Sequence, residues 1–266
     1  MTAFHESLDG AAHWAAMTCG DIRETASADG SVMVVPVGSV EQHGRHLPVA
    51  TDTILVDAVV HEGADRVTDE VPLLVTPPVW SGFSPHHLSF GGTLSLEFDH
   101  LRAVLEDVAR TGLKNGFDGV LFVNGHGGNM AMIDAVVSTV GTEADAEVLG
   151  TTYFQLATDA VEEIRDSETG GMAHGGEFET SLMLHFCPDF VAEERDAELW
   201  DEHYERGSRD LLEGGPVSVY RSFDEYSASG AIGAPDLASA AKGERIAEVV
   251  GDELGALLVA VHEHNA

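Results

Sequence analysis

Positive charge is scarce in this chain, and its scarcity excludes whole classes of partner. Only 13 of the 266 residues are Lys or Arg, against 46 Asp or Glu, so the net charge is −33. A field of that sign repels nucleic acid and anionic membranes. Because the acidic residues are spread along the chain rather than gathered in a tail, we interpret them as a halophilic surface. Such a surface stays hydrated in high salt, which screens its self-repulsion.

Cysteine and long apolar runs are also lacking. Cys19 and Cys187 lie far apart and belong to no CxxC pair, which excludes a disulfide framework. No apolar run is long enough to span a membrane, and the start does not resemble a signal peptide. We therefore expect a soluble, cytoplasmic protein. There is no internal repeat, low-complexity tract or clear linker, so residues 1–266 are interpreted as a single domain.

What is present is an alternation of strand and helix patterns. Apolar runs typical of buried strands occupy residues 31–37, 71–79, 118–123 and 147–154. Helical patterns lie at 52–66, 96–115, 129–141 and 236–262, and Gly116 is a stop signal for the second of these. This alternation predicts an α/β fold with a mostly parallel sheet covered on both faces. The acidic stretch 190–232 is less periodic and is predicted to form a helix plus a long loop over the site.

The most informative stretch is GSVEQHGRHLPVATD at 38–52, directly after the first strand. It holds Glu41, His43, His46 and Asp52 within a dozen positions. Carboxylate oxygen and imidazole nitrogen are ligands that divalent transition metals select. Because ligands collect at the carboxyl ends of strands in open α/β sheets, the stretch indicates a metal site at that edge.

Other segments add side chains of the same kind. His126, in VNGHGGN at 123–129, follows the third strand, and its glycines allow a tight turn. The loop lacks the lysine and the glycine spacing of a phosphate-binding loop. HGGEFETS at 174–181 supplies His174 and Glu177 one helical turn apart, with Glu179 pointing elsewhere if the segment is helical.

Taken alone, several of these residues have ordinary structural explanations. Asp52 could cap a helix, and His126 could simply hydrogen-bond in a turn. We interpret His86 and His87, in SPHHLSFGGTLSL at 84–96, as structural or substrate-side residues rather than metal ligands. What favours a metal site is convergence, because acids and imidazoles follow two of the predicted strands and recur in a third segment. Pocket walls are expected from aromatic loop residues, namely Trp80, Phe83, Phe223 and Tyr226.

In order along the chain, these motifs resemble the creatininase (creatinine amidohydrolase) family. FGGTLSL at 90–96 and SGAIGAPDLASAAKGERI at 229–246 extend the resemblance over residues 10 to 260. It implies a three-layer αβα sandwich, two divalent metal ions per chain (zinc, or else manganese or iron) and a homo-oligomer, often a hexamer.

The resemblance also implies a ligand set. Glu41, Asp52 and His126 would hold one metal, and His43 and Asp52 the other, with Asp52 bridging. Creatininase proper resembles NGHYEN and takes a further glutamate from that motif. This chain has Gly128 there, so Glu177 is the expected substitute, and the departure counts against creatinine itself as the substrate. His46 is expected to be structural.

The predicted function is hydrolysis of a C–N bond, other than an ordinary peptide bond, in a small linear or cyclic amide. A metal-bridging hydroxide would attack the carbonyl, and backbone N–H groups of Gly127 or Gly128 would stabilise the oxyanion. His174 is the candidate proton donor, with Glu177 either a ligand or the general base. The alternatives are a hydrolase or isomerase of a sugar-like substrate, a peptidase of a modified-peptide pathway, and a non-catalytic metal-binding protein.

Overall fold

The computed structural model describes residues 12–199 and 204–266, and its centre is a four-stranded parallel sheet. The strands are β1 (Val32–Val37), β2 (Leu73–Val75), β3 (Gly119–Asn124) and β4 (Glu147–Thr152), in the order β2-β1-β3-β4. Every residue of β1 and β3 is buried, which explains why both read as unbroken apolar runs rather than alternating ones.

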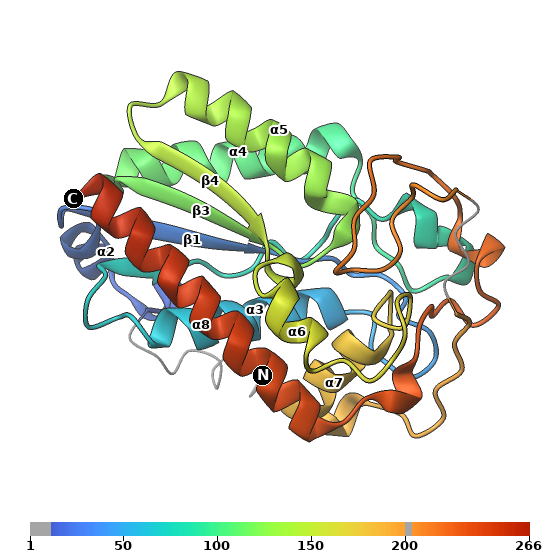
Figure 1. The fold of residues 1–266 in the computed structure, drawn as a ribbon. Helices are drawn as coiled ribbons and strands as arrows, with labels where there is room; N and C mark the ends of the chain where they lie inside the picture. The colour runs from blue at the N-terminus through green and yellow to red at the C-terminus, as the bar shows by residue number, and fades with distance from the viewer. Residues whose placement is uncertain (1–11, 200–203) are drawn as a thin grey trace.

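Helices cover both faces of the sheet (Figure 1). On one face lie α3 (Thr51–Asp65) and α8 (Ala240–Asn265), with α7 (Glu177–Phe186) packed against both. On the other lie α2 (Cys19–Ala26), α4 (Phe98–Asn115) and α5 (Met130–Glu143). A short helix, α6 (Thr158–Glu162), follows β4. The predicted three-layer αβα architecture is therefore confirmed.

Alternate residues of one strand enter different cores. Val32 and Val34 of β1 face the layer of α3 and α8, whereas Met33 and Val35 face the layer of α4 and α5. None of the described helices is both long and apolar enough to cross a membrane.

Proline and glycine set two of the element boundaries. The second strand is only three residues long, since Pro72, Pro77 and Pro78 flank it. α4 ends where expected, because Gly116 adopts a left-handed conformation (φ 108°) and caps it.

The helix predicted within 190–232 is wrong over its described part. Residues 190–199 and 204–232 contain no α-helix, and besides the end of a 3₁₀ turn at Pro188–Phe190 they form one further such turn, Phe223–Glu225. The expected long loop is present.

The register of the two central strands sets the position of the site. Val37 of β1 pairs with Asn124 of β3, so both strands end level with each other. Glu41 and His126 follow these ends by four and two residues, and Asp52 lies in the first turn of α3. Three of the predicted ligands therefore meet at one edge of the sheet.

Candidate metal centre

Four of the five predicted metal ligands lie together, buried, at the carboxyl end of the sheet. His43 Nε2 is 3.0 Å from Asp52 Oδ1. His126 Nδ1 is 3.1 Å from Glu41 Oε2 and 3.2 Å from Asp52 Oδ2. Each of these four side chains is at most 4% exposed. The two oxygens of Asp52 thus face two different imidazoles.

The fifth predicted ligand, Glu177, lies outside this cluster. It is the first residue of α7, and its carboxylate accepts hydrogen bonds from the backbone N–H groups of Asp166 and Ser167, both at 2.9 Å, and from Lys242 Nζ. The expectation that Glu177 joins the other ligands is wrong.

Glu179 takes the place expected for Glu177. Its Oε1 lies 3.7 Å from His43 Nε2, and its Oε2 accepts a 2.6 Å hydrogen bond from the backbone N–H of Gly175. The reason is helical phase: α7 starts at Glu177, and residues two apart on a helix point to nearly opposite sides. His174 precedes the helix, so the one-turn relation assumed between His174 and Glu177 does not exist.

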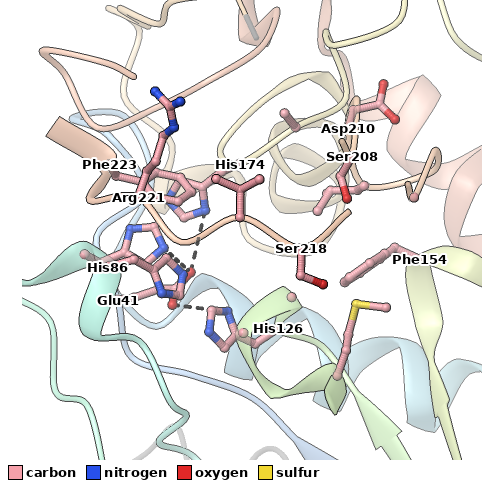
Figure 2. Close-up of a pocket in the computed structure, with 18 of the residues that line it drawn as sticks. Glu41, His86, His126, Phe154, His174, Ser208, Asp210, Ser218, Arg221 and Phe223 are labelled. Carbon is pink, nitrogen blue, oxygen red and sulfur yellow. Dashed lines mark ion pairs between the residues drawn. The ribbon is translucent and has the colours of Figure 1, made fainter. Parts of the chain in front are cut away.

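His174 and His87 also face Glu41. His174 Nδ1 is 3.6 Å from Glu41 Oε1, and His87 Nε2 is 3.2 Å from the same oxygen. Figure 2 shows the imidazoles of His126 and His174 directed at this carboxylate from different segments. No local sequence pattern places His87 against Glu41, because its segment follows only the short β2 strand.

Hydrogen bonds outside the cluster orient the imidazoles. His43 Nδ1 donates to Glu41 O at 3.1 Å, which leaves its Nε2 to face the carboxylates. His174 Nε2 donates to Gln42 O at 2.6 Å, which turns its unprotonated Nδ1 toward Glu41. His46, expected to be structural, lies 2.9 Å from Gly175 O and 3.1 Å from Thr180 Oγ1. It braces the turn that carries His174.

The carboxylates of the cluster raise the pKa values of two of its histidines, as expected for a site that lacks positive charge. Burial lowers the pKa of His126, but Glu41 and Asp52 raise it to about 10. Burial likewise opposes protonation of His43, yet Asp52 and Glu179 raise its pKa well above the usual value. The imidazoles of His43 and His126 therefore retain a proton, and the resulting positive charge balances the carboxylates as a bound cation would.

The residues present fit a metal. His43 Nε2 and Asp52 Oδ2 are buried, and neither has a hydrogen-bond partner. Donors within reach of a single ion include the groups Glu41–His43–Asp52, His43–His174–Glu179 and Glu41–His86–His126. Carboxylate and imidazole donors suit zinc, manganese and iron alike.

The cluster opens into a cavity of about 500 Å³. Glu41, Asp52, His126, His174 and Glu179 line one end, and Phe154, Ser208 and Ser218 lie across from them (Figure 2). Among the expected aromatic walls, Phe223 and Tyr226 line the cavity, while Trp80 is 54% exposed and does not. His86 lines it too, and burial, together with the charges of His87 and His126, lowers the pKa of its imidazole to about 3.

Comparison with known proteins agrees with these features. The family model described as "Creatininase: Creatinine amidohydrolase" matches residues 15–258. A mycofactocin precursor peptide peptidase of Mycolicibacterium smegmatis is 36% identical over 226 residues, which are 82% of this chain and 81% of the relative. The creatinine amidohydrolase of Pseudomonas putida is 28% identical over 88% of this chain and 90% of its own.

Solved structures share the whole fold. A structure titled "Creatininase Mn" superimposes with a TM-score of 0.80 at 26% identity, covering 96% of this chain and 99% of the other. A Zn–Zn form of a mutant creatininase superimposes with a TM-score of 0.79, also at 26% identity. The match covers 95% of this chain and 98% of the other. Both the sequence match and the structural match span the candidate centre, and the chain therefore belongs to the creatininase family.

Proposed function

We propose that this protein is a metal-dependent hydrolase that cleaves the C–N bond of a small amide. One observation carries the proposal: the two oxygens of Asp52 face His43 and His126, at 3.0 and 3.2 Å, as a carboxylate shared between two ions would. Peptidases and amidohydrolases, the named activities of the relatives above, both break amide C–N bonds. The alternative of a sugar-like substrate is not favoured.

The chain's own donors divide into two sets around Asp52. Glu41 and His126 lie on one side, and His43 and Glu179 on the other. These five residues are the proposed ligands of two divalent ions, with zinc first and manganese or iron as alternatives. When bound, such a pair supplies Lewis acidity and lowers the pKa of a water toward neutrality.

His174 is the proposed proton carrier. Its Nε2–H donates a hydrogen bond to Gln42 O. The unprotonated Nδ1 can therefore take a proton from the attacking water and pass it to the leaving nitrogen. Burial and the charges of His43 and His87 hold the pKa of His174 well below its usual value, which keeps Nδ1 unprotonated before reaction.

Backbone N–H groups have two further roles in the proposed site. The cavity wall includes Gly127 and Gly128, whose backbone N–H groups are the proposed donors to the developing oxyanion. Gly175 N–H fixes the Glu179 carboxylate, which leaves Glu179 as a ligand and His174 as the base.

The test combines metal analysis with a substrate screen. We expect about two divalent ions per chain, and amine release from one or more formamides, cyclic amides such as creatinine, or short peptides in high salt. Chelation or Asp52→Ala should abolish turnover, while His174→Asn should lower kcat by roughly 10²–10⁴-fold with the metal retained. Pure protein without a stoichiometric divalent ion would exclude the proposal.

A further inference from the structure

One cation lies on the wall of the catalytic cavity. Arg221 is part of the segment 217–226, most of which lines the cavity and whose Phe223 packs against His174. Among the described residues that line the cavity it is the one Arg or Lys; the other charged groups are carboxylates and histidines. A single guanidinium in an otherwise acidic cavity is a candidate for recognising charge.

No ion pair joins Arg221 to the part of the chain that the structure describes. Within the described chain, no carboxylate lies within ion-pair distance of its guanidinium, whereas Arg165 and Lys242 each pair with buried acids. The guanidinium of Arg221 lies over the ring of Tyr226, with 5.7 Å from Cζ to the ring centroid. An aromatic face restricts a guanidinium without using up its N–H donors.

The position of Arg221 relative to the cluster limits what it can bind. Phe223, two residues further on, packs its ring against His87 and His174, with centroids 4.1 and 4.9 Å apart. Figure 2 shows the Arg221 guanidinium turned away from Glu41 and His126. A group held by the Arg221 guanidinium would therefore lie apart from the side chains that face the reacting carbonyl.

Asp210, the acid on the cavity wall outside the proposed metal ligands, does not compete for Arg221. The carboxylate of Asp210 accepts hydrogen bonds from Arg165 and from the backbone N–H groups of Gly170 and Leu212. The net charge of −33 repels anions from the molecule as a whole, so an anion enters this cavity only against that field. Among the described side chains that line the cavity, Arg221 is the one whose fixed positive charge can pair with such an anion away from the metal ligands.

We propose that Arg221 binds a carboxylate carried by the substrate at a distance from its scissile amide. A guanidinium pairs with a carboxylate through two parallel N–H···O bonds, which gives both affinity and orientation. This inference rests on the proposed amide hydrolysis, because it names the class of amide: an amide bearing a free carboxylate, such as an N-acyl amino acid or a peptide with a free C-terminus.

The experiment compares matched substrates on the metal-loaded protein. ω-(Formylamino)alkanoates of two to five methylenes, and peptides with free C-termini, are each paired with the corresponding primary carboxamide. We expect kcat/KM to be about tenfold or more higher for the acid, mainly through KM. Arg221→Gln should erase the difference and Arg221→Lys should restore part of it.

The matched control is Arg209→Gln, which removes the same charge from the same loop. Arg209 is exposed, pairs with Glu213 and does not line the cavity, so this variant should keep the acid preference. All comparisons are made at one ionic strength, because salt screens the pairing.

Binding separates failure of this inference from failure of the proposed function. Succinic acid monohydroxamate and its carboxamide are titrated into wild-type protein and Arg221→Gln by calorimetry. About tenfold tighter binding of the acid, lost in Arg221→Gln, supports the inference even if no amide is cleaved. Equal affinities, or a preference that survives Arg221→Gln, overturn it even if amides are hydrolysed.

Discussion

Lys242 and Glu177 form an ion pair in the interior, where the first turn of α8 meets the start of α7. The side chain of Lys242 is 6% exposed and that of Glu177 is 0% exposed. Lys242 Nζ also donates to Leu237 O at 2.7 Å and lies 2.8 Å from the Asp166 carboxylate. The pair ties both helices to the loop that precedes His174.

Removing one partner of this pair should be costly. Lys242→Met would leave the Glu177 carboxylate buried without a cation, and we expect it to lower the free energy of unfolding by about 3–5 kcal/mol. Denaturant unfolding measures this change. Adding Glu177→Gln to Lys242→Met should recover a large part of the loss, and a single variant as stable as wild type would contradict the reading of this pair.

The two glutamates of α7 should differ in their effect on metal content. Glu179→Gln removes an oxygen facing His43, so we expect bound metal to fall from about two ions per chain to about one. Glu177→Gln, which touches none of the proposed ligands, should leave metal content unchanged in the folded fraction. Emission spectrometry of desalted protein distinguishes the two, and equal metal loss in both variants would argue against the placement of Glu179.

Gly128 should not tolerate even a methyl group. A Cβ at this position would lie 2.4 Å from His126 Nε2 and 2.5 Å from Phe83 O, so His126 would have to move. We expect Gly128→Ala to weaken metal binding by about 10–100-fold, as measured by competition with a chelator. Gly127→Ala is the matched control, since nothing lies within 4 Å of a Cβ there, and it should bind metal normally.

Stability should depend on Asp57 in a defined pH window. Burial raises the pKa of Asp57 to about 6, while burial and His13 lower the pKa of its neighbour His61 to about 4. At neutral pH Asp57 is therefore charged beside a neutral imidazole, 3.8 Å away. Because its folded pKa exceeds the unfolded value of about 3.9, charging Asp57 reduces stability as pH rises from about 4 through 6.

Asp57→Asn removes this cost. The Asp57 side chain is 31% exposed, so we expect a gain of about 1–2 kcal/mol at pH 8 and a much smaller one at pH 4.5. Urea unfolding of both proteins at each pH gives the difference. A gain that is the same at both pH values would show that charge at Asp57 is not its cause.

The sequence predicted the sheet and most of the cluster because both follow from local patterns. Buried strands at 31–37 and 118–123 set where Glu41 and His126 emerge, and parallel strands put their ends at one edge. These relations need no knowledge of distant contacts.

Glu177 was misplaced because its role depends on the residue at which a helix begins. Gly175 and Gly176 are the signal that could have located that start, since the second glycine caps α7 and fixes which glutamate turns inward. The ion pair with Lys242 joins residues 65 positions apart, and the position of His87 beside Glu41 joins residues 46 apart. The loop containing Arg221 has no hydrophobic periodicity, so the sequence could not predict its backbone conformation.

The proposed ligands are separated by up to 138 positions along the chain, from Glu41 to Glu179. An unfolded chain keeps only Glu41, His43 and Asp52 near one another, so it captures metal poorly, whereas the folded chain presents all five donors at once. Metal in the medium would therefore act as a folding ligand and favour the native state by mass action.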